Sequence, residues 1–326
     1  MNKAVHSSLL TIVIAIAVYA IVVVFTGGSD VIGAIQSLSW ELWSVLLLLS
    51  LLNYLLRYWR WHLYISHQNP HSITHLQHLS IYIAGFALTM TPGKAGEGMR
   101  SLYLKQHGIA HQRSIGALFV ERIMDLLVIL MMAGLGASFL SGGQTFWAVL
   151  VTLVIISSAI IIVKMPKDKI IASRIVQALP EKLRHIIVFV ESMLNNANDL
   201  LSLRFIFIGL FIGAIAWGLE GYGLYLTMDS FAIKPFVMPE NAVYLALAIY
   251  GMAILLGAIS FLPGGLGGTE AAMIFMLVNV GFDNASAIAI TFICRIATLW
   301  FAMALGVLMM FMLSFLGIKL NQSTVG

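Results

Sequence analysis

The chain has 326 residues, of which 60% are hydrophobic and 10% are charged, and its formal net charge is +4. Because a soluble domain has about 25% charged residues, this composition excludes a water-exposed globular protein. It indicates an all-α, polytopic membrane bundle that forms a single domain over residues 1–326. The basic excess lies in loops between apolar stretches, so it does not indicate nucleic acid as a partner. The single Cys294 excludes an intramolecular disulfide.

Apolar runs long enough to cross a bilayer, about 20 residues each, recur along the chain. The first run follows Lys3 and could be taken for a signal peptide. It has no convincing small-x-small cleavage site, so we expect it to be retained as a helix. The predicted spanning helices cover residues 9–26, 42–64, 114–139, 145–164, 204–227 and 285–315.

Two further apolar stretches, residues 79–91 and 242–262, are interrupted by proline and glycine. Proline removes a backbone donor and glycine permits positive φ, so each helix should break there. Backbone with unpaired polar groups is tolerated at membrane depth only where it faces protein or a water-filled cavity. The predicted break residues are Pro92, Gly93, Gly96, Pro263, Gly264, Gly265 and Gly267.

Each break begins a charged motif that occurs twice at the same internal spacing. A glutamate is followed 11 residues later by a glycine, and the glycine is followed 14 residues later by an arginine. A duplicated motif of this kind in an apolar chain is typical of an internally repeated membrane transporter. The two copies are Glu97, Gly108 and Arg122, and Glu270, Gly281 and Arg295.

The distribution of lysine and arginine predicts the orientation. Basic residues precede the first predicted helix, lie near the end of the second (Arg57 and Arg60), flank the first break and fill residues 164–204. Residues 27–41 and 140–145 have none. By the positive-inside rule, both termini and the central loop face the cytoplasm, in the inner (cytoplasmic) membrane of the cell. The two broken elements would then enter from opposite faces as re-entrant hairpins. This predicts an inverted-topology repeat with units of about 42–139 and 204–315. The alternative is that residues 242–262 cross the membrane alone, which changes the orientation.

The segment that joins the repeats, residues 165–203, contains an amphipathic pattern. Leu183, Ile187, Val190 and Leu194 follow one another at steps of three and four. The pattern predicts a helix that either lies on the cytoplasmic membrane interface or packs as an elbow on the bundle.

Several charged residues lie in apolar surroundings, where a charge at the bilayer centre costs about 2.5–3.5 kcal/mol on insertion scales. Such groups normally pair or face a polar cavity. Glu97 and Glu270 are expected to pair with Arg122 and Arg295, either within one repeat or across the two. These residues either fix the hairpins in place or also line a translocation path. The predicted path residues are Lys94, Glu97, Arg100, Glu121, Arg122, Asp125, Glu220, Glu270 and Arg295.

Three of these predictions have alternatives. Lys94 and Arg100 flank the first break, where free backbone amides and a cation would receive a phosphate. The alternative is that they only set the orientation of the chain. Glu220 either lines the path or is held by Trp217 and Tyr222 near an interface.

A cluster of histidines lies around one loop, but no carboxylate or cysteine accompanies it. We therefore expect no metal and no other cofactor. P-loop, G-x-S-x-G and H-E-x-x-H motifs are absent from the sequence, so we do not expect an enzyme. The histidines are His62, His67, His71, His75 and His78.

The two motif copies, together with Glu121 and Asp125, resemble the lysylphosphatidylglycerol synthase transmembrane-region family, over about residues 10–315. In fused members of that family, a soluble aminoacyl-transferase domain modifies a phospholipid and the membrane region moves it between leaflets. The sequence ends about ten residues after its last predicted helix, so we expect that soluble domain to be absent. The resemblance thus implies lipid translocation and not lipid modification.

The sequence therefore predicts a flippase-like protein that moves a phosphate-containing lipid, a phospholipid or a polyprenyl-phosphate-linked lipid, between leaflets along a polar path. One alternative is a membrane partner of a lipid-modifying enzyme, without transport of its own. Another is a membrane-embedded transferase on a polyprenyl-phosphate substrate. The expected partners are the lipid and the bilayer, and either a second copy of the chain or a lipid-biosynthesis enzyme.

Overall fold

A computed structural model describes residues 33, 35–36, 38–68, 73–89, 97–135, 154, 157–158, 180–232, 241–260 and 262–315. Every helix or strand assigned within these ranges is a helix, which confirms the all-α prediction. Four of the described helices are long and apolar enough to cross a membrane. The predicted span 9–26, nearly all of the span 145–164, and Pro92, Gly93, Lys94 and Gly96 lie outside the described residues.

The first half of the bundle begins with the long helix α3 (Trp40–Gln68). Helix α4 (His75–Ala84) follows and continues into the 3₁₀ turn η1 (Gly85–Leu88) before the predicted break. Beyond the break, the short helix α5 (Arg100–Lys105) leads through a turn at Gly108, where φ is 79°, into α6 (His111–Leu135). The predicted span 114–139 overlaps α6, which is not among the four helices that are long and apolar enough to cross a membrane.

The second half repeats this order. Helix α11 (Leu203–Ser230) is followed by α12 (Ala242–Ile259), the 3₁₀ turn η4 (Pro263–Gly265) and α13 (Gly268–Val280). A glycine turn at Gly281, where φ is 119°, then leads into one continuous helix. This helix consists of α14 (Asn284–Arg295), a π-helical segment η5 (Ile296–Trp300) and α15 (Phe301–Phe315).

The second break lies where the sequence predicts it. Helix α12 ends before Pro263, and Gly264, Gly265 and Gly267 have φ values of 64°, 69° and 81°. Residues with a Cβ rarely adopt this region, so the glycines let the chain reverse between α12 and α13. The re-entrant course of this element in a membrane stays a prediction.

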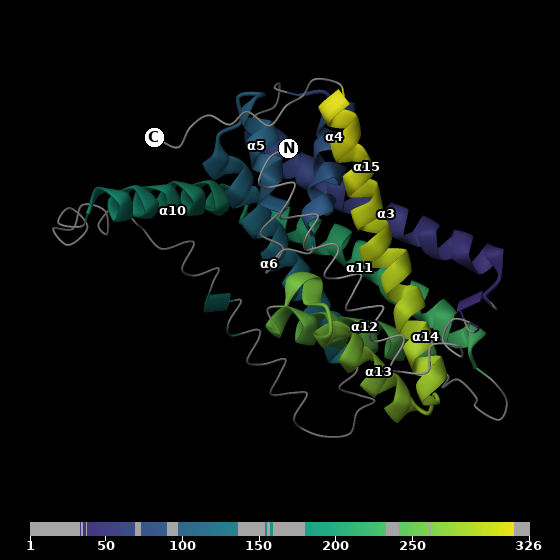
Figure 1. The fold of residues 1–326 in the computed structure, drawn as a ribbon. Coiled ribbons are helices and arrows are strands. Elements are labelled where there is room, and N and C mark those ends of the chain that lie inside the picture. Colours follow the sequence, from purple (N-terminus) through teal and green to yellow (C-terminus); the bar gives the residue numbers. More distant parts are fainter. Residues whose placement is uncertain are drawn as a thin grey trace.

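The two halves pack against each other reciprocally. Helices α3 and α11 lie side by side, α6 packs against α12, and α15 packs against α4 and η1 (Figure 1). The arginine-bearing helix of each half thus rests on the helix that leads to the break in the other half. A reciprocal arrangement is expected of an internal repeat, and entry from opposite membrane faces stays a prediction.

Small residues allow these contacts at equivalent positions. Ala133 on α6 and Gly306 on α15 each lie 11 residues beyond the motif arginine of their half. The backbone nitrogen of Ala133 lies 2.8 Å from where a Cβ on Gly251 of α12 would be. A Cβ on Gly306 would overlap the backbone of η1 at Ala87. Small side chains let two helix backbones approach closely, as in other membrane bundles.

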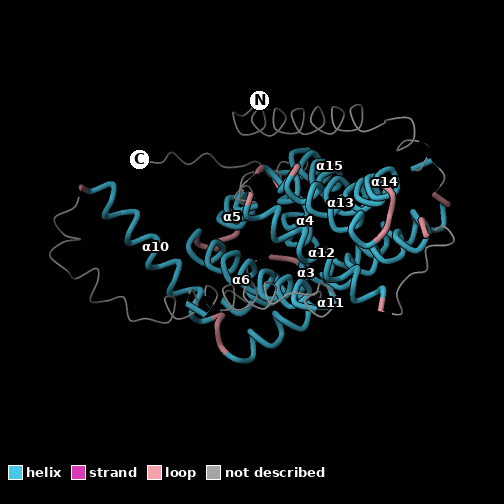
Figure 2. The backbone as a smooth tube through the Cα atoms, turned by 90° about the horizontal axis from the view of Figure 1, so that it is seen from below, coloured by secondary structure: helices cyan, strands magenta, loops and turns pink. Residues whose placement is uncertain are grey.

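Helix α10 (Glu181–Asp199) projects from the bundle in both views (Figures 1 and 2). Its C-terminal part packs on α6, where a Cβ on Gly116 would lie 2.8 Å from the carbonyl oxygen of Met193. Its N-terminal part exposes apolar side chains, among them Leu183 and Ile186. The sequence thus predicts the helix correctly, and its contact with a membrane surface stays a prediction.

Candidate functional site

The centre of the first half is a buried group of ion pairs between α3 and α6. A polar stripe on α3 (Asn53, Arg57, Arg60 and Tyr64) recurs at steps of four, three and four, so its members share one helix face. Arg60 Nη2 lies 2.5 Å from Asp125 Oδ1 on α6, and Arg57 Nη2 lies 3.5 Å from Asp125 Oδ2. Both arginines are buried, so they neutralise the acidic residues of α6 instead of facing the cytoplasm.

Arg100 joins the same group from α5. Its guanidinium pairs with Glu97 at 2.9 Å and with Glu121 at 3.4 Å. It also lies 3.9 Å from the ring centroid of Tyr82 and 5.4 Å from that of Trp61, which are cation–π distances. Arg100 is only 1% exposed, because these rings and carboxylates surround it. Its position therefore does not support the prediction that it receives a lipid phosphate.

The repeated glutamate and arginine pair within each half. Glu97 Oε2 lies 3.1 Å from Arg122 Nη2, and Glu270 Oε1 lies 2.6 Å from Arg295 Nε. The equal spacing in sequence therefore corresponds to an equivalent contact in space. Of the two pairings left open by the sequence, the structure contains the one within each repeat.

In the second copy, the motif side chains also satisfy the backbone at the break. Arg295 Nη2 donates to the carbonyl oxygen of Gly264 at 3.1 Å. The amide of Gly267 donates to Glu270 Oε2 at 2.6 Å, which caps the N-terminus of α13. Because buried backbone groups need partners, this arrangement stabilises the irregular segment inside the bundle.

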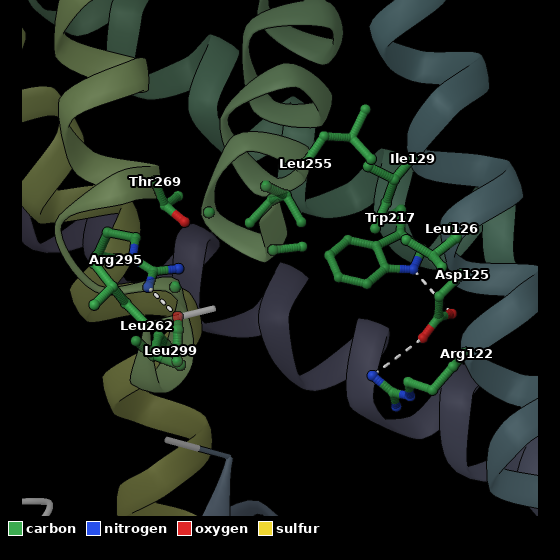
Figure 3. A pocket seen from close by; sticks show the side chains of 15 residues that line it. Arg122, Asp125, Leu126, Ile129, Trp217, Leu255, Leu262, Thr269, Arg295 and Leu299 are labelled. Carbon is green, nitrogen blue, oxygen red and sulfur yellow. Dashed lines mark hydrogen bonds and ion pairs between the residues drawn. The ribbon is translucent and has the colours of Figure 1, made fainter. Parts of the chain in front are cut away.

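A cavity of about 270 Å³ lies between the two halves (Figure 3). Arg122 and Asp125 line it from α6, and Arg295 lines it from the opposite side. Trp217 of α11 also lines it and donates from Nε1 to Asp125 Oδ1 at 3.0 Å. The remaining lining is largely apolar and includes Leu126, Ile129, Leu255, Leu262 and Leu299.

A second, smaller chamber of about 50 Å³ adjoins this cavity. It shares Trp217, Ile254, Arg295 and Leu299 with the larger space. The phenol of Tyr250 on α12 donates to the carboxylate of Glu220. Glu220 therefore lines the chamber and accepts a hydrogen bond from Tyr250, whereas Tyr222, which the sequence suggested as a partner together with Trp217, is 40% exposed. The polar side chains that line the chamber include Arg57, Thr89, Glu97, Glu220 and Tyr250.

The predicted path residues thus fall into three sets. Arg122, Asp125 and Arg295 line the larger cavity, and Glu97 and Glu220 line the smaller chamber. Glu121, Arg100 and Glu270 form ion pairs with neighbouring residues but line neither space. Lys94 lies outside the described residues.

Sequence reasoning interpreted Arg57 and Arg60 as orientation signals, and did not single out Tyr250. The spacing of the polar stripe on α3 is the signal that would have identified the two arginines. Among the histidines that the structure describes, His62 and His78 pair through their Nδ1 atoms at 2.8 Å. Groups of three or more side chains suited to a metal are absent from the described residues.

Comparison with known proteins agrees with the resemblance inferred from the motifs. The family model described as the lysylphosphatidylglycerol synthase TM region matches residues 12–306, which include both motif copies. A UPF0104 membrane protein of Methanothermobacter thermautotrophicus is 26% identical over an alignment of 306 residues, and the match covers 87% of this chain and 87% of the relative.

Proposed function

We propose that this chain, which belongs to the lysylphosphatidylglycerol synthase TM-region family, moves a phosphate-containing lipid between the two leaflets of its membrane. The main support is the cavity between the halves, where the motif arginines Arg122 and Arg295 lie opposite each other among apolar side chains. An amphiphile requires this combination, because its phosphate binds guanidinium groups and its chains favour apolar walls.

Arg122 retains the capacity to bind such a headgroup. Its side chain is 24% exposed, whereas its partner Glu97 is 1% exposed. A phosphate in the cavity would contact the exposed part of the Arg122 guanidinium, and Arg295 would bind from the other side.

Transport, and not catalysis, is the reading that the acidic residues favour. Glu97, Glu121, Asp125 and Glu270 each lie within 4 Å of at least one arginine nitrogen. Each of these carboxylates is already engaged by a cation of the protein, whereas a catalytic acid or base must reach a substrate. We further propose that the protein lies in the inner membrane with both termini in the cytoplasm, and that the halves form an inverted repeat.

Lipid translocation in proteoliposomes tests the proposal. Fluorescent phospholipid analogues with several headgroups would be placed in both leaflets. A bleaching reagent added outside acts at once on outer-leaflet analogue, and on inner-leaflet analogue only after that lipid has crossed the bilayer. Wild type would be compared with Glu97→Gln and Arg295→Ala. Arg184→Ala is the matched control, because it removes an exposed arginine from α10.

We expect fast bleaching of inner-leaflet lipid with wild type and the control, and slow bleaching with the two motif variants. Gel filtration and circular dichroism would establish that each variant is folded. If folded wild type moves none of the headgroups, the protein is not a translocase for them, and the result favours a non-transporting membrane partner. If the motif variants translocate as fast as wild type, the path does not run through the motif.

A further inference from the structure

We propose that Glu220 is a proton-binding site, and that it takes up one proton when an anionic headgroup enters the adjoining cavity. The first part stands on the smaller chamber alone, and the second part rests on the proposed function. Glu220 is 6% exposed and lines this chamber beside Arg295, which also lines the larger cavity. The two binding events would therefore occur on either side of one arginine.

The contact between Glu220 and Tyr250 can exist in both protonation states of the carboxyl group. A phenol can donate a hydrogen bond to a carboxylate, or accept one from a protonated carboxyl group. A guanidinium can only donate, so a carboxylate that is paired with arginine loses an interaction when it binds a proton. Glu97 and Glu270 are paired with arginines at 3.1 Å and 2.6 Å, so each would give up such an interaction on protonation.

The chamber also has room for a water molecule beside Glu220. Its volume of about 50 Å³ exceeds the roughly 10–15 Å³ of such space that one water needs. Thr89 lines the chamber and is 5% exposed, and its Oγ1 lacks a hydrogen-bond partner among the described residues. A water in the chamber would bridge Thr89 to the carboxyl groups and would deliver the proton to Glu220.

Charge balance explains why lipid and proton would bind together. Among the described residues, five arginines and five acidic residues lie buried in the bundle or line its cavity. Their charges sum to zero when all ten are ionised. An uncompensated charge in such surroundings is costly. A phosphodiester adds one negative charge, and protonation of Glu220 removes one. The arginines are Arg57, Arg60, Arg100, Arg122 and Arg295, and the acidic residues are Glu97, Glu121, Asp125, Glu220 and Glu270.

Neighbours from four helices and the opposite side of the chamber set the charge environment of Glu220. Cationic neighbours favour its ionised form, and anionic neighbours and burial favour its protonated form. The titratable and charged groups are Tyr54 and Arg57 from α3, Asp125 from α6, Tyr250 from α12, Cys294 and Arg295 from α14, and Glu97 across the chamber.

Infrared spectroscopy of the reconstituted protein tests the proton site without any transport assay. As the pH falls from neutral to mildly acidic, wild type should gain the C=O band of a buried protonated carboxyl group. Glu220→Gln should lack that gain, and Tyr250→Phe should shift the frequency of the band because the phenol no longer hydrogen-bonds to the carboxyl group. Glu181→Gln, which changes an exposed glutamate of α10, should behave as wild type. A band that is absent in wild type, or unchanged in Glu220→Gln, would overturn the proposal.

The coupling is tested by the pH dependence of translocation, with fluorescent phosphatidylglycerol as the anionic probe and fluorescent phosphatidylcholine as the neutral one. For wild type, translocation of the anionic probe should accelerate on acidification, by at most about tenfold per pH unit for one proton. The neutral probe should show no such acceleration, and Glu220→Gln should abolish it. Equal acceleration in Glu220→Gln would refute the coupling. An infrared band that depends on Glu220, without any lipid movement, would keep the proton site and refute the proposed function.

Discussion

Replacing Arg295 with methionine should destabilise the protein far more than the same change at Arg122, although the two arginines occupy equivalent motif positions. The side chains of Arg295 and Glu270 are 5% and 8% exposed, and their nearest atoms lie 2.6 Å apart. Removing one partner of a buried pair costs about 3–5 kcal/mol, because the other charge stays buried without compensation. In the unfolding equilibrium, this is a factor of between about 100 and 4,000.

The cost at Arg122 should be clearly smaller than at Arg295, because its side chain is 24% exposed. Its two closest acidic partners also keep another arginine. Glu97 retains Arg100 at 2.9 Å, and Asp125 retains Arg60 at 2.5 Å. The structure therefore predicts unequal costs for two residues that the sequence presents as equivalent.

Reversible unfolding in mixed detergent micelles, followed by circular dichroism, would measure both costs. The double variant Glu270→Leu, Arg295→Met should recover most of the loss, since an apolar pair carries no buried charge. About 1 kcal/mol should remain lost, because Glu270 also caps α13 through the amide of Gly267. Equal costs at Arg122 and Arg295, or a double variant as unstable as the sum of its single variants, would refute this reasoning.

Three further predictions concern single elements. Asp283→Ala should cost about 1 kcal/mol in the same unfolding assay, because Asp283 is the N-cap of α14. Hydrogen bonds from a nearby serine hold the pKa of Asp283 below its usual range, so its stabilisation is present at neutral pH and is lost as the pH falls through the lowered value. Gly306→Ala should destabilise the protein strongly, because the added Cβ would overlap the backbone of η1. The control Gly218→Ala should be neutral or stabilising by up to about 1 kcal/mol, because its Cβ would lie in open space. The third prediction uses single cysteines in a cysteine-free background and a thiol reagent that cannot cross the membrane. Gly93→Cys should react only from the cytoplasm, and Leu262→Cys should react only from outside. Labelling of both from one face would contradict the inverted repeat.

Much of the fold follows from local patterns that need no tertiary information. Apolar length identifies α3, α11 and the helix from α14 to α15, and Pro263 with its glycines predicts the break that follows α12. These features depend on backbone chemistry and on the hydrophobic thickness of a membrane, and both can be read from a short stretch of sequence.

The site is only partly predictable, because partner choice depends on which helix faces come together. The sequence identifies Glu97 and Arg122 as charged motif residues, and the structure shows that Arg100 competes for the same carboxylate. In a sequence, an arginine near the end of a helix indicates orientation in the membrane. Only the packing of α3 on α6 shows that Arg57 and Arg60 are buried. The pairing of Glu220 with Tyr250 likewise requires the contact between α11 and α12.

The reciprocal packing of the halves has a consequence for biogenesis. When α6 has been synthesised, the helix on which it rests, α12, lies more than 100 residues further along the chain. The contact between α6 and Gly251 therefore cannot form until α11 and α12 have been synthesised. A nascent first half must keep its buried arginines compensated by α3, α5 and α6 alone during that interval. Each half expressed separately should therefore be degraded, and coexpression of the two halves, split before α10, should restore a folded protein.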